Sequence, residues 1–78
     1  MSDYTVTFGR RVRTLLYEDV DGVIQLSFDI DTSEGKKLVF LYPKKRSIVR
    51  SEQGRNDLAY ERTKEYLLSR GYQIGTIR

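Results

Sequence analysis

The sequence is 78 residues long and contains no cysteine and no histidine. Its length predicts one domain spanning residues 1–78. The two missing residue types exclude disulfide bonds, thiolate or imidazole metal ligands, cysteine nucleophiles and serine–histidine catalytic triads. The sequence shows neither a basic leader followed by an apolar stretch nor an apolar run long enough to span a membrane. We therefore expect a soluble, cytoplasmic protein that requires no cofactor.

The net charge of +3 comes from 14 basic and 11 acidic residues, which are unevenly distributed. Residues 14–35 contain six acidic residues and no basic residue, whereas residues 36–55 contain seven basic residues and a single acidic one, Glu52. Such an asymmetry predicts two surfaces of different charge.

Taken in chain order, the first predicted strand is Tyr4–Phe8, whose apolar residues alternate with threonine. Gly9 then predicts a bulge or a sharp bend. Residues 10–17 continue with a strand-like pattern. The sequence is therefore compatible with either one bent strand or two strands over residues 4–17.

The clearest periodic signal is Val23–Asp31, where apolar and polar residues alternate strictly from Ile24 onward. Strict alternation describes a strand with one buried and one exposed face. The preceding pair Asp21-Gly22 predicts a tight hairpin that joins this strand to residues 10–17. We expect the rest of the fold to be laid against this central strand.

The next predicted strand, Leu38–Tyr42, consists of five consecutive apolar residues. Such a run indicates a strand that is covered on both faces, or one whose outer face is used for binding. Pro43 ends the strand because it has no N–H to donate. A basic connector over residues 44–50 follows.

One helix is predicted over Leu58–Ser69, with Asn56 or Asp57 as its N-cap. The sequence is also compatible with an earlier start near Ser51, but Gly54 argues against it. The apolar face of this helix is narrow, as expected for a helix that lies on one side of a sheet. Residues 72–78 alternate as a returning edge strand would.

These elements predict an α+β fold. The sheet is expected to be small and antiparallel, with three to five strands and one helix packed on one face, in the order β-β-β-α-(β). The other face of the sheet would then be exposed or would be the working surface.

The basic residues carry the first functional hypothesis, a non-enzymatic module that binds DNA or RNA. Basic side chains interleaved with tyrosine on an open sheet face would suit phosphates and stacked bases. Antiparallel pairing places residues 10–13 beside residues 28–31. It places Lys44–Arg46 at the opposite end, near Asp19 and Asp21, so the bases need not form one patch. The predicted phosphate-binding residues are Arg10, Arg11, Arg13, Lys36, Lys37, Lys44, Lys45 and Arg46, with Tyr17 and Tyr42 as stacking residues.

A second hypothesis is a protein–protein interaction or homodimerisation module. It would use the apolar Leu38–Tyr42 strand or an exposed sheet edge, because unpaired strand edges readily pair with another strand.

The end of the central strand carries a third hypothesis. Leu26–Ser33 is an apolar strand that runs into Asp29-x-Asp31, and it resembles the opening motif of the haloacid-dehalogenase phosphohydrolases. The resemblance implies metal-dependent phosphate chemistry, with Asp29 as the nucleophile and Asp31 as the general acid. That family needs a parallel sheet, a later lysine and further acids. An antiparallel setting instead favours a solvated strand end whose acids balance nearby basic side chains, so we expect no catalytic residue and no metal site.

Overall fold

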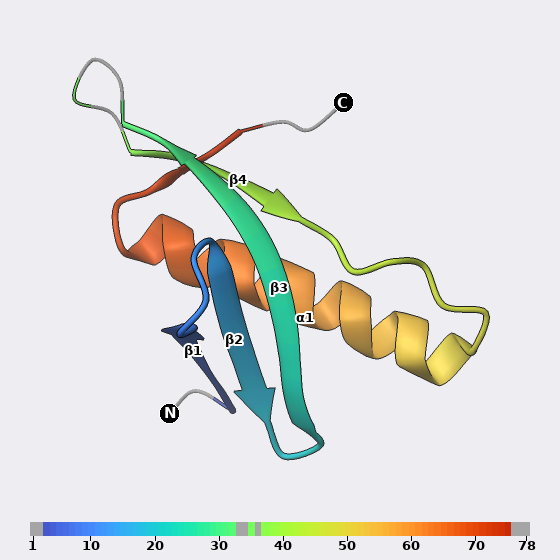
Figure 1. Ribbon diagram of the computed structural model, residues 1–78. Helices are drawn as coiled ribbons and strands as arrows, with labels where there is room; N and C mark the ends of the chain where they lie inside the picture. Colours follow the sequence, from blue (N-terminus) through green and yellow to red (C-terminus); the bar gives the residue numbers. More distant parts are fainter. Residues whose placement is uncertain (1–2, 33–34, 36, 76–78) are drawn as a thin grey trace.

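The computed structural model describes residues 3–32, 35 and 37–75, and its strands and single helix confirm the α+β class (Figure 1). The strands form one sheet in the order β1-β2-β3-β4-β5. In chain order the elements are β1 (Tyr4–Phe8), β2 (Thr14–Asp19), β3 (Gly22–Asp31), β4 (Leu38–Tyr42), α1 (Arg50–Ser69) and β5 (Gln73–Ile74).

Strands β1 to β4 form an antiparallel meander in which neighbours in sequence are neighbours in the sheet. β5 pairs with β4 in parallel, because α1 returns the chain to the end of the sheet at which β4 begins. The antiparallel prediction therefore holds for β1 to β4. The returning edge strand predicted over residues 72–78 is present as β5, while residues 76–78 lie outside the described part of the chain.

Residues 4–17 form two strands rather than one bent strand. The turn between them ends at Arg13, whose φ of 60° is in the left-handed region. The turn is closed by a hydrogen bond from the Gly9 N–H to the Thr14 carbonyl oxygen (2.8 Å). The bend predicted at the glycine is thus a complete reversal of the chain.

β3 follows the predicted alternation as far as Phe28. Ile24, Leu26 and Phe28 are buried, and the residues between them are exposed. Ile30, which the alternation also places on the buried face, is 44% exposed. The hairpin predicted before this strand is present, with Asp19 opposite Gly22 across the turn. The central element of the fold was therefore predictable from its period alone.

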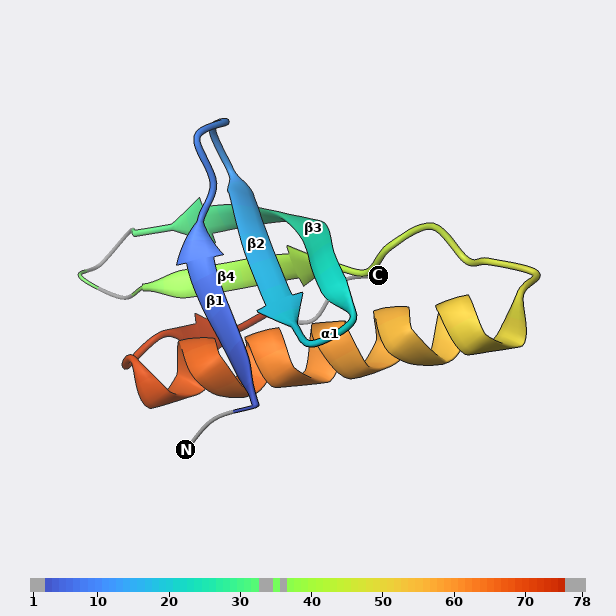
Figure 2. The same cartoon turned by 90° about the horizontal axis from the view of Figure 1, so that it is seen from below.

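α1 covers one face of the sheet (Figure 2). Its buried residues Ala59, Thr63 and Leu67 form the narrow stripe that the sequence predicted. No helix in the described part of the chain is long and apolar enough to cross a membrane. The sheet supplies the rest of the core, which consists of Val6, Leu15, Tyr17, Ile24, Leu26, Phe28, Val39 and Leu41.

α1 begins at Arg50, about two turns before the favoured start at Leu58 and beside Ser51, the earlier start that Gly54 argued against. The favoured start was therefore wrong. Ser47 ties the connector to the first turns of the helix. Its N–H donates to the Gln53 side chain (2.7 Å), and its hydroxyl accepts a hydrogen bond from the Val49 N–H (3.1 Å). Gly54 costs about 1 kcal/mol relative to alanine, and the helix includes it nonetheless.

The two faces of β4 are buried to different degrees. Val39 and Leu41 lie in the core. On the other face, Leu38 and Phe40 are half-buried, and the Phe40 ring lies directly over Gly75, so closely that a Cβ atom at the glycine would overlap the ring. Tyr42 is partly exposed at the end of the strand. The outer face of β4 is therefore only partly covered.

Candidate binding site beside strand β3

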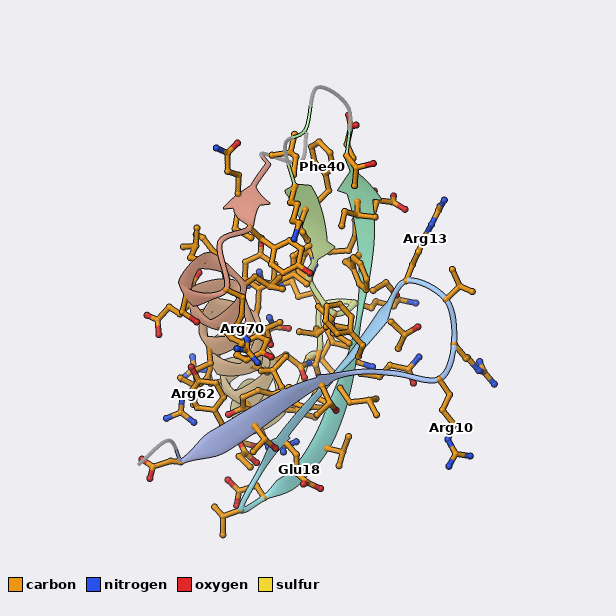
Figure 3. The ribbon with its side chains drawn as sticks, turned by 90° about the vertical axis from the view of Figure 1, so that its left-hand side faces the viewer. Arg10, Arg13, Glu18, Phe40, Arg62 and Arg70 are labelled. Carbon is orange, nitrogen blue, oxygen red and sulfur yellow. The ribbon has the colours of Figure 1, made fainter. Side chains whose placement is uncertain are left out.

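The predicted basic residues lie in two separate regions. Arg10, Arg11 and Arg13 lie on the turn between β1 and β2, which projects from the sheet (Figure 3). Lys44–Arg46 lie between β4 and α1, on the segment of residues 43–49 that we call the connector. The structure thus gathers the predicted phosphate-binding residues into two groups rather than one patch.

The β1–β2 turn is tied to the C-terminal half of β3. An ion pair joins Arg13 Nη1 to Asp29 Oδ1 at 3.0 Å, and the Tyr42 hydroxyl donates to the other oxygen of Asp29 at 2.6 Å. The hydrogen bond to this carboxylate raises the pKa of Tyr42. These contacts confirm the predicted neighbourhood of residues 10–13 and 28–31 at Arg13, and they confirm that Asp29 balances a basic side chain. Among the residues the structure describes, no three acidic side chains converge as a metal site would require.

Tyr17 is not available to stack on a base, which corrects its predicted role. Its side chain is fully buried, and its ring stacks on Tyr4 with 5.6 Å between the ring centroids. Of the lysines predicted before β4, Lys37 lies 5.6 Å from the centroid of the Tyr72 ring. Lys36 lies outside the described residues. Tyr42 is therefore the partly exposed member of the two predicted stacking residues.

The described cations divide into those with a partner and those without. Lys44–Arg46 are exposed, and none of them forms an ion pair with another described residue. Arg10 and Arg11 share this property on the β1–β2 turn. The cations with partners are Arg13 and Arg55 in ion pairs, and Lys37, Arg62 and Arg70 over tyrosine rings.

The connector lies beside a stretch of β3 that is paired on one side. β3 has ten residues, but β4 pairs only with Ser27–Asp31. Gly22–Leu26 pair with β2 and have no described strand on their other side. The mismatch arises because Pro43 ends β4 and the chain then turns away toward α1 (Figure 1).

The backbone of this stretch presents hydrogen-bonding groups to its unpaired side. The Phe28 N–H donates to the Arg13 carbonyl oxygen at 3.0 Å. Along an antiparallel pair, residues whose backbone groups bond the partner strand alternate with residues whose backbone groups point away from it. Because Phe28 bonds on the β2 side, the backbone groups of Leu26, Ile24 and Gly22 face β2 as well. Val23 and Gln25 therefore direct their N–H and C=O groups toward the place where β4 would have continued.

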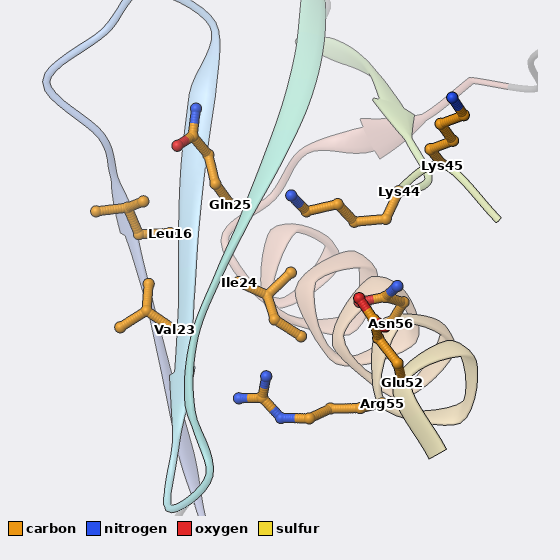
Figure 4. Close-up of a pocket in the computed structure, with 9 residues that line it drawn as sticks. All are labelled: Leu16, Val23, Ile24, Gln25, Lys44, Lys45, Glu52, Arg55 and Asn56. Carbon is orange, nitrogen blue, oxygen red and sulfur yellow. The ribbon is translucent and has the colours of Figure 1, made fainter. Parts of the chain in front are cut away.

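A groove of about 580 Å³ lies between this edge and the N-terminal half of α1 (Figure 4). In Figure 4 the Lys44 side chain extends from the connector toward β3, and the Arg55 side chain extends from the helix toward the hairpin. We call this space the edge groove. Its main lining residues are Leu16, Val23 and Gln25 from the sheet, Lys44 and Lys45 from the connector, and Arg55 from α1.

The β2–β3 hairpin closes one end of the edge groove by binding α1. Arg55 Nη2 lies 2.8 Å from Asp19 Oδ1, and the two side chains are only 26% and 7% exposed. Asp19 also accepts hydrogen bonds from the Tyr17 hydroxyl (2.8 Å) and the Asp21 N–H (2.9 Å). The hydrogen bond from Arg55, followed by that from Tyr17, lowers the pKa of Asp19 to about 2. This contact fixes the spacing between the hairpin and the helix.

A second set of contacts supports this end of the groove from the core side. The Tyr17 hydroxyl accepts a hydrogen bond from Arg62 Nη1 (2.9 Å), and the Arg62 guanidinium lies 5.1 Å from the centroid of the Tyr4 ring. Burial raises the pKa of Tyr17, and its hydrogen bond to Asp19 raises it further. The hairpin and the helix are therefore joined by a continuous polar network.

Sequence reasoning missed the edge groove because it placed Arg55 outside the helix. One signal for the groove was nevertheless present. The predicted strand Val23–Asp31 is almost twice as long as its predicted neighbour Leu38–Tyr42, which Pro43 ends. Two neighbouring strands of unequal length leave part of the longer one without a partner.

Comparison of the chain with protein-family models, with curated proteins and with solved structures gave no match. Function is therefore inferred from the geometry of the site alone.

Proposed function

We propose that the protein is a non-enzymatic binding module that takes an extended segment of a partner protein into the edge groove, where the segment adds to β3 as a further strand. The observation that supports this proposal is the half-paired state of β3, with Val23 and Gln25 directing backbone groups into a groove. An extended peptide satisfies such groups in the same way as a neighbouring strand does.

The dimensions of the edge suit a short segment. At roughly 3.3 Å per residue, Gly22–Leu26 offer an edge about 16 Å long, which matches an added strand of roughly five residues. Tyr42 and Pro43 bound this stretch at the β4 end, and the hairpin bound to α1 bounds it at the other. A segment of this length would gain main-chain hydrogen bonds without any change in the fold.

The edge is better suited to a partner protein than to a second copy of this chain. Lysine side chains beside a strand edge discourage pairing between identical edges, because two copies would bring like charges together. Lys44 and Lys45 lie beside the unpaired stretch of β3. β4, which the sequence suggested for self-association, pairs with β3 on one side, and on the other side β5 pairs with Leu38 and Val39 and so covers the first part of that edge.

The test is a comparison of two variants in the presence of a short peptide of alternating valine and glutamine. Gln25→Pro removes an N–H that faces the groove and leaves the ladder to β2 intact, whereas Gln25→Ala keeps the N–H. We expect peptide addition to shift the Val23 and Gln25 amide signals of Gln25→Ala and of the unsubstituted protein in NMR spectra. Gln25→Pro should abolish the shift at Val23. Equal binding by both variants, or shifts confined to Val6 and Phe8 on the outer edge of β1, would contradict the proposed location.

Nucleic-acid binding is the second candidate function, and the unpaired cations of the connector favour it. Consecutive exposed bases that are free of acidic partners are suited to phosphates. If Lys44–Arg46 each contact one phosphate, replacing all three should reduce the slope of log affinity against log salt by about 2 to 3.

Oligonucleotides at two salt concentrations separate the two functions. Binding that weakens steeply with salt and ignores Gln25→Pro would support a nucleic-acid ligand. Binding of the valine–glutamine peptide that is sensitive to this substitution and nearly independent of salt would support strand addition.

A further inference from the structure

We infer that the segment taken by the edge groove is acidic, with carboxylates that are bound by Lys44 and Lys45. The inference rests on the proposed strand addition and adds the chemistry of the partner. It follows from the charges that line the groove and from how many of them are already satisfied.

The positive charges of the groove are not all available to a ligand. Arg55 is committed to Asp19 at 2.8 Å. Lys44 and Lys45 form no ion pair with a described residue, although both line the groove. The acid on the helix side, Glu52, accepts a hydrogen bond from the Ser47 hydroxyl (3.0 Å) and keeps its negative charge, which offsets one of the two lysines. The groove therefore keeps two ammonium groups whose charge nothing in the described structure neutralises by direct contact.

The position of these two lysines suits a strand that lies between them and β3. In Figure 4 Lys44 extends across the opening toward the strand, whereas the Lys45 side chain points away from the opening at its rim. An added strand would lie alongside the connector, because both follow the edge of β3. A carboxylate of that strand could then meet Lys44 directly, and a second one near the rim could be met by Lys45.

The opposite side of the groove has a different character. Val23 is 54% exposed and lies beside Leu16, and both line the groove. Since successive side chains of a strand point to opposite faces, an added strand that directs carboxylates to the lysines directs its other side chains away from them. An apolar residue at those positions would cover Val23. The preferred segment thus alternates acidic and apolar residues.

A peptide fits these observations better than a nucleic acid does. Phosphates would satisfy Lys44 and Lys45, but they leave the donors and acceptors of Val23 and Gln25 without the regular partners that a peptide backbone provides. The acidic peptide accounts for both sets of groups at once.

The experiment compares three peptides of equal length that alternate valine with glutamate, with glutamine or with lysine, each titrated into the full chain by calorimetry at low and high salt. We expect the glutamate peptide to bind roughly three- to tenfold more tightly than the glutamine peptide at low salt, and less so at high salt. The lysine peptide should bind more weakly than either.

The double variant Lys44→Gln/Lys45→Gln should remove the advantage of the glutamate peptide and leave the glutamine peptide unchanged. The matched control Arg10→Gln/Arg11→Gln removes the same charge from the β1–β2 turn, and we expect it to preserve the advantage. A merely general attraction between net charges would respond equally to the two double variants and would overturn the inference.

The outcomes separate this inference from the proposed function. Equal affinity for all three peptides would overturn the acidic partner while leaving strand addition standing. No binding of any peptide would overturn both. Binding of a single-stranded oligonucleotide that depends on Lys44 and Lys45, together with no binding of the glutamate peptide, would assign the groove to nucleic acid instead.

Discussion

The two halves of β3 share one alternating sequence but have different neighbours. The half formed by Ser27–Asp31 pairs with β4, and only Ser27 within it also pairs with β2. The half formed by Gly22–Leu26 pairs with β2 alone and is joined to α1 at its hairpin by the ion pair between Asp19 and Arg55. Each half therefore has a strand ladder on one side. The first half is also held to the β1–β2 turn by the Phe28–Arg13 backbone bond and the Arg13–Asp29 ion pair, and the second half is held to the helix. One strand can thus serve both the core and a binding edge. The core uses the side chains on one face of the strand, whereas the edge uses its backbone N–H and C=O groups.

The strongest way to break this comparison is to remove a core side chain from β4, the strand that pairs with Ser27–Asp31. Leu41 is fully buried on β4, opposite Phe28. Leu41→Ala should lower the free energy of unfolding by about 2–5 kcal/mol, since it deletes buried methyl groups and leaves a cavity. Denaturant titration measures the loss. The control Ile48→Ala changes a fully exposed residue of the connector, and a loss there as large as that of Leu41→Ala would contradict the assigned core.

Hydrogen exchange compares the two halves directly. The amides of Val23 and Gln25 face the edge groove, while those of Ser27 and Asp29 face β4. An amide without a partner in a neighbouring strand exchanges without the strands having to separate. We therefore expect the amides of Val23 and Gln25 to exchange on the order of a hundredfold faster than those of Ser27 and Asp29. Exchange followed by NMR provides the measurement. Equal protection would show that the groove edge is already paired.

The hairpin contact should matter less than the core and more than a surface pair. Asp19→Asn weakens the bond to Arg55 and the bond from Tyr17 in a partly buried setting. We expect a loss of stability smaller than that of Leu41→Ala, measured by thermal unfolding. A neutral result would mean that the hairpin is held by its turn alone.

The same contact predicts a pH dependence. The pKa of Asp19 falls from 3.8 to about 2 in the folded state. A carboxyl with a depressed folded pKa adds stability that is fully present well above 3.8 and is lost as the pH falls through about 2. The free energy of unfolding, plotted against pH from neutral downward, should therefore fall less steeply for Asp19→Asn than for the unsubstituted protein. If the two plots are parallel, the Asp19 carboxyl does not contribute to the loss of stability at low pH.

The smallest effect is expected at the exposed ion pair on the half of β3 that pairs with β4. Arg13 and Asp29 form an ion pair whose side chains are 67% and 41% exposed. Because solvent screens such a pair, Arg13→Gln should change the free energy of unfolding by no more than about 1 kcal/mol. Denaturant titration at low and high salt would check this. If Arg13→Gln lowered the free energy of unfolding as much as Asp19→Asn does, the exposed Arg13–Asp29 pair would be as stabilising as the more buried Arg55–Asp19 pair, which would contradict this expectation.

The parts of this structure that were predictable depend on local pattern. The alternation of Val23–Asp31 and the turn at Asp21-Gly22 identified β3 and its hairpin, because both signals lie within a few residues of what they describe. The burial of Tyr17 could not be deduced in the same way. Leu15, Leu16 and Tyr17 are consecutive and apolar, so the sequence leaves open which of them faces the core.

The helix side of the edge groove was beyond local pattern for a further reason. The contact between Arg55 and Asp19 joins residues that are 36 positions apart in the chain. It also requires an early start of α1, where hydrogen bonds made by Ser47 tie the connector to the helix. The two basic groups were recognised as separable from strand directions alone, but which cations keep a free charge depends on side-chain partners that only the structure provides.

The close approach of Phe40 to Gly75 also governs how the protein behaves in concentrated solution. β4 is an uncharged, strongly apolar strand, the kind of segment that initiates aggregation when its edge is open. The two residues of β5 pair with Leu38 and Val39 and so cover the first part of that edge, and they are followed at once by a glycine whose missing side chain leaves room for the Phe40 ring. A methyl group at this position would overlap the ring, so either the ring or the last strand would have to shift. Part of the protection of β4 against edge-to-edge association therefore depends on a residue that has no side chain.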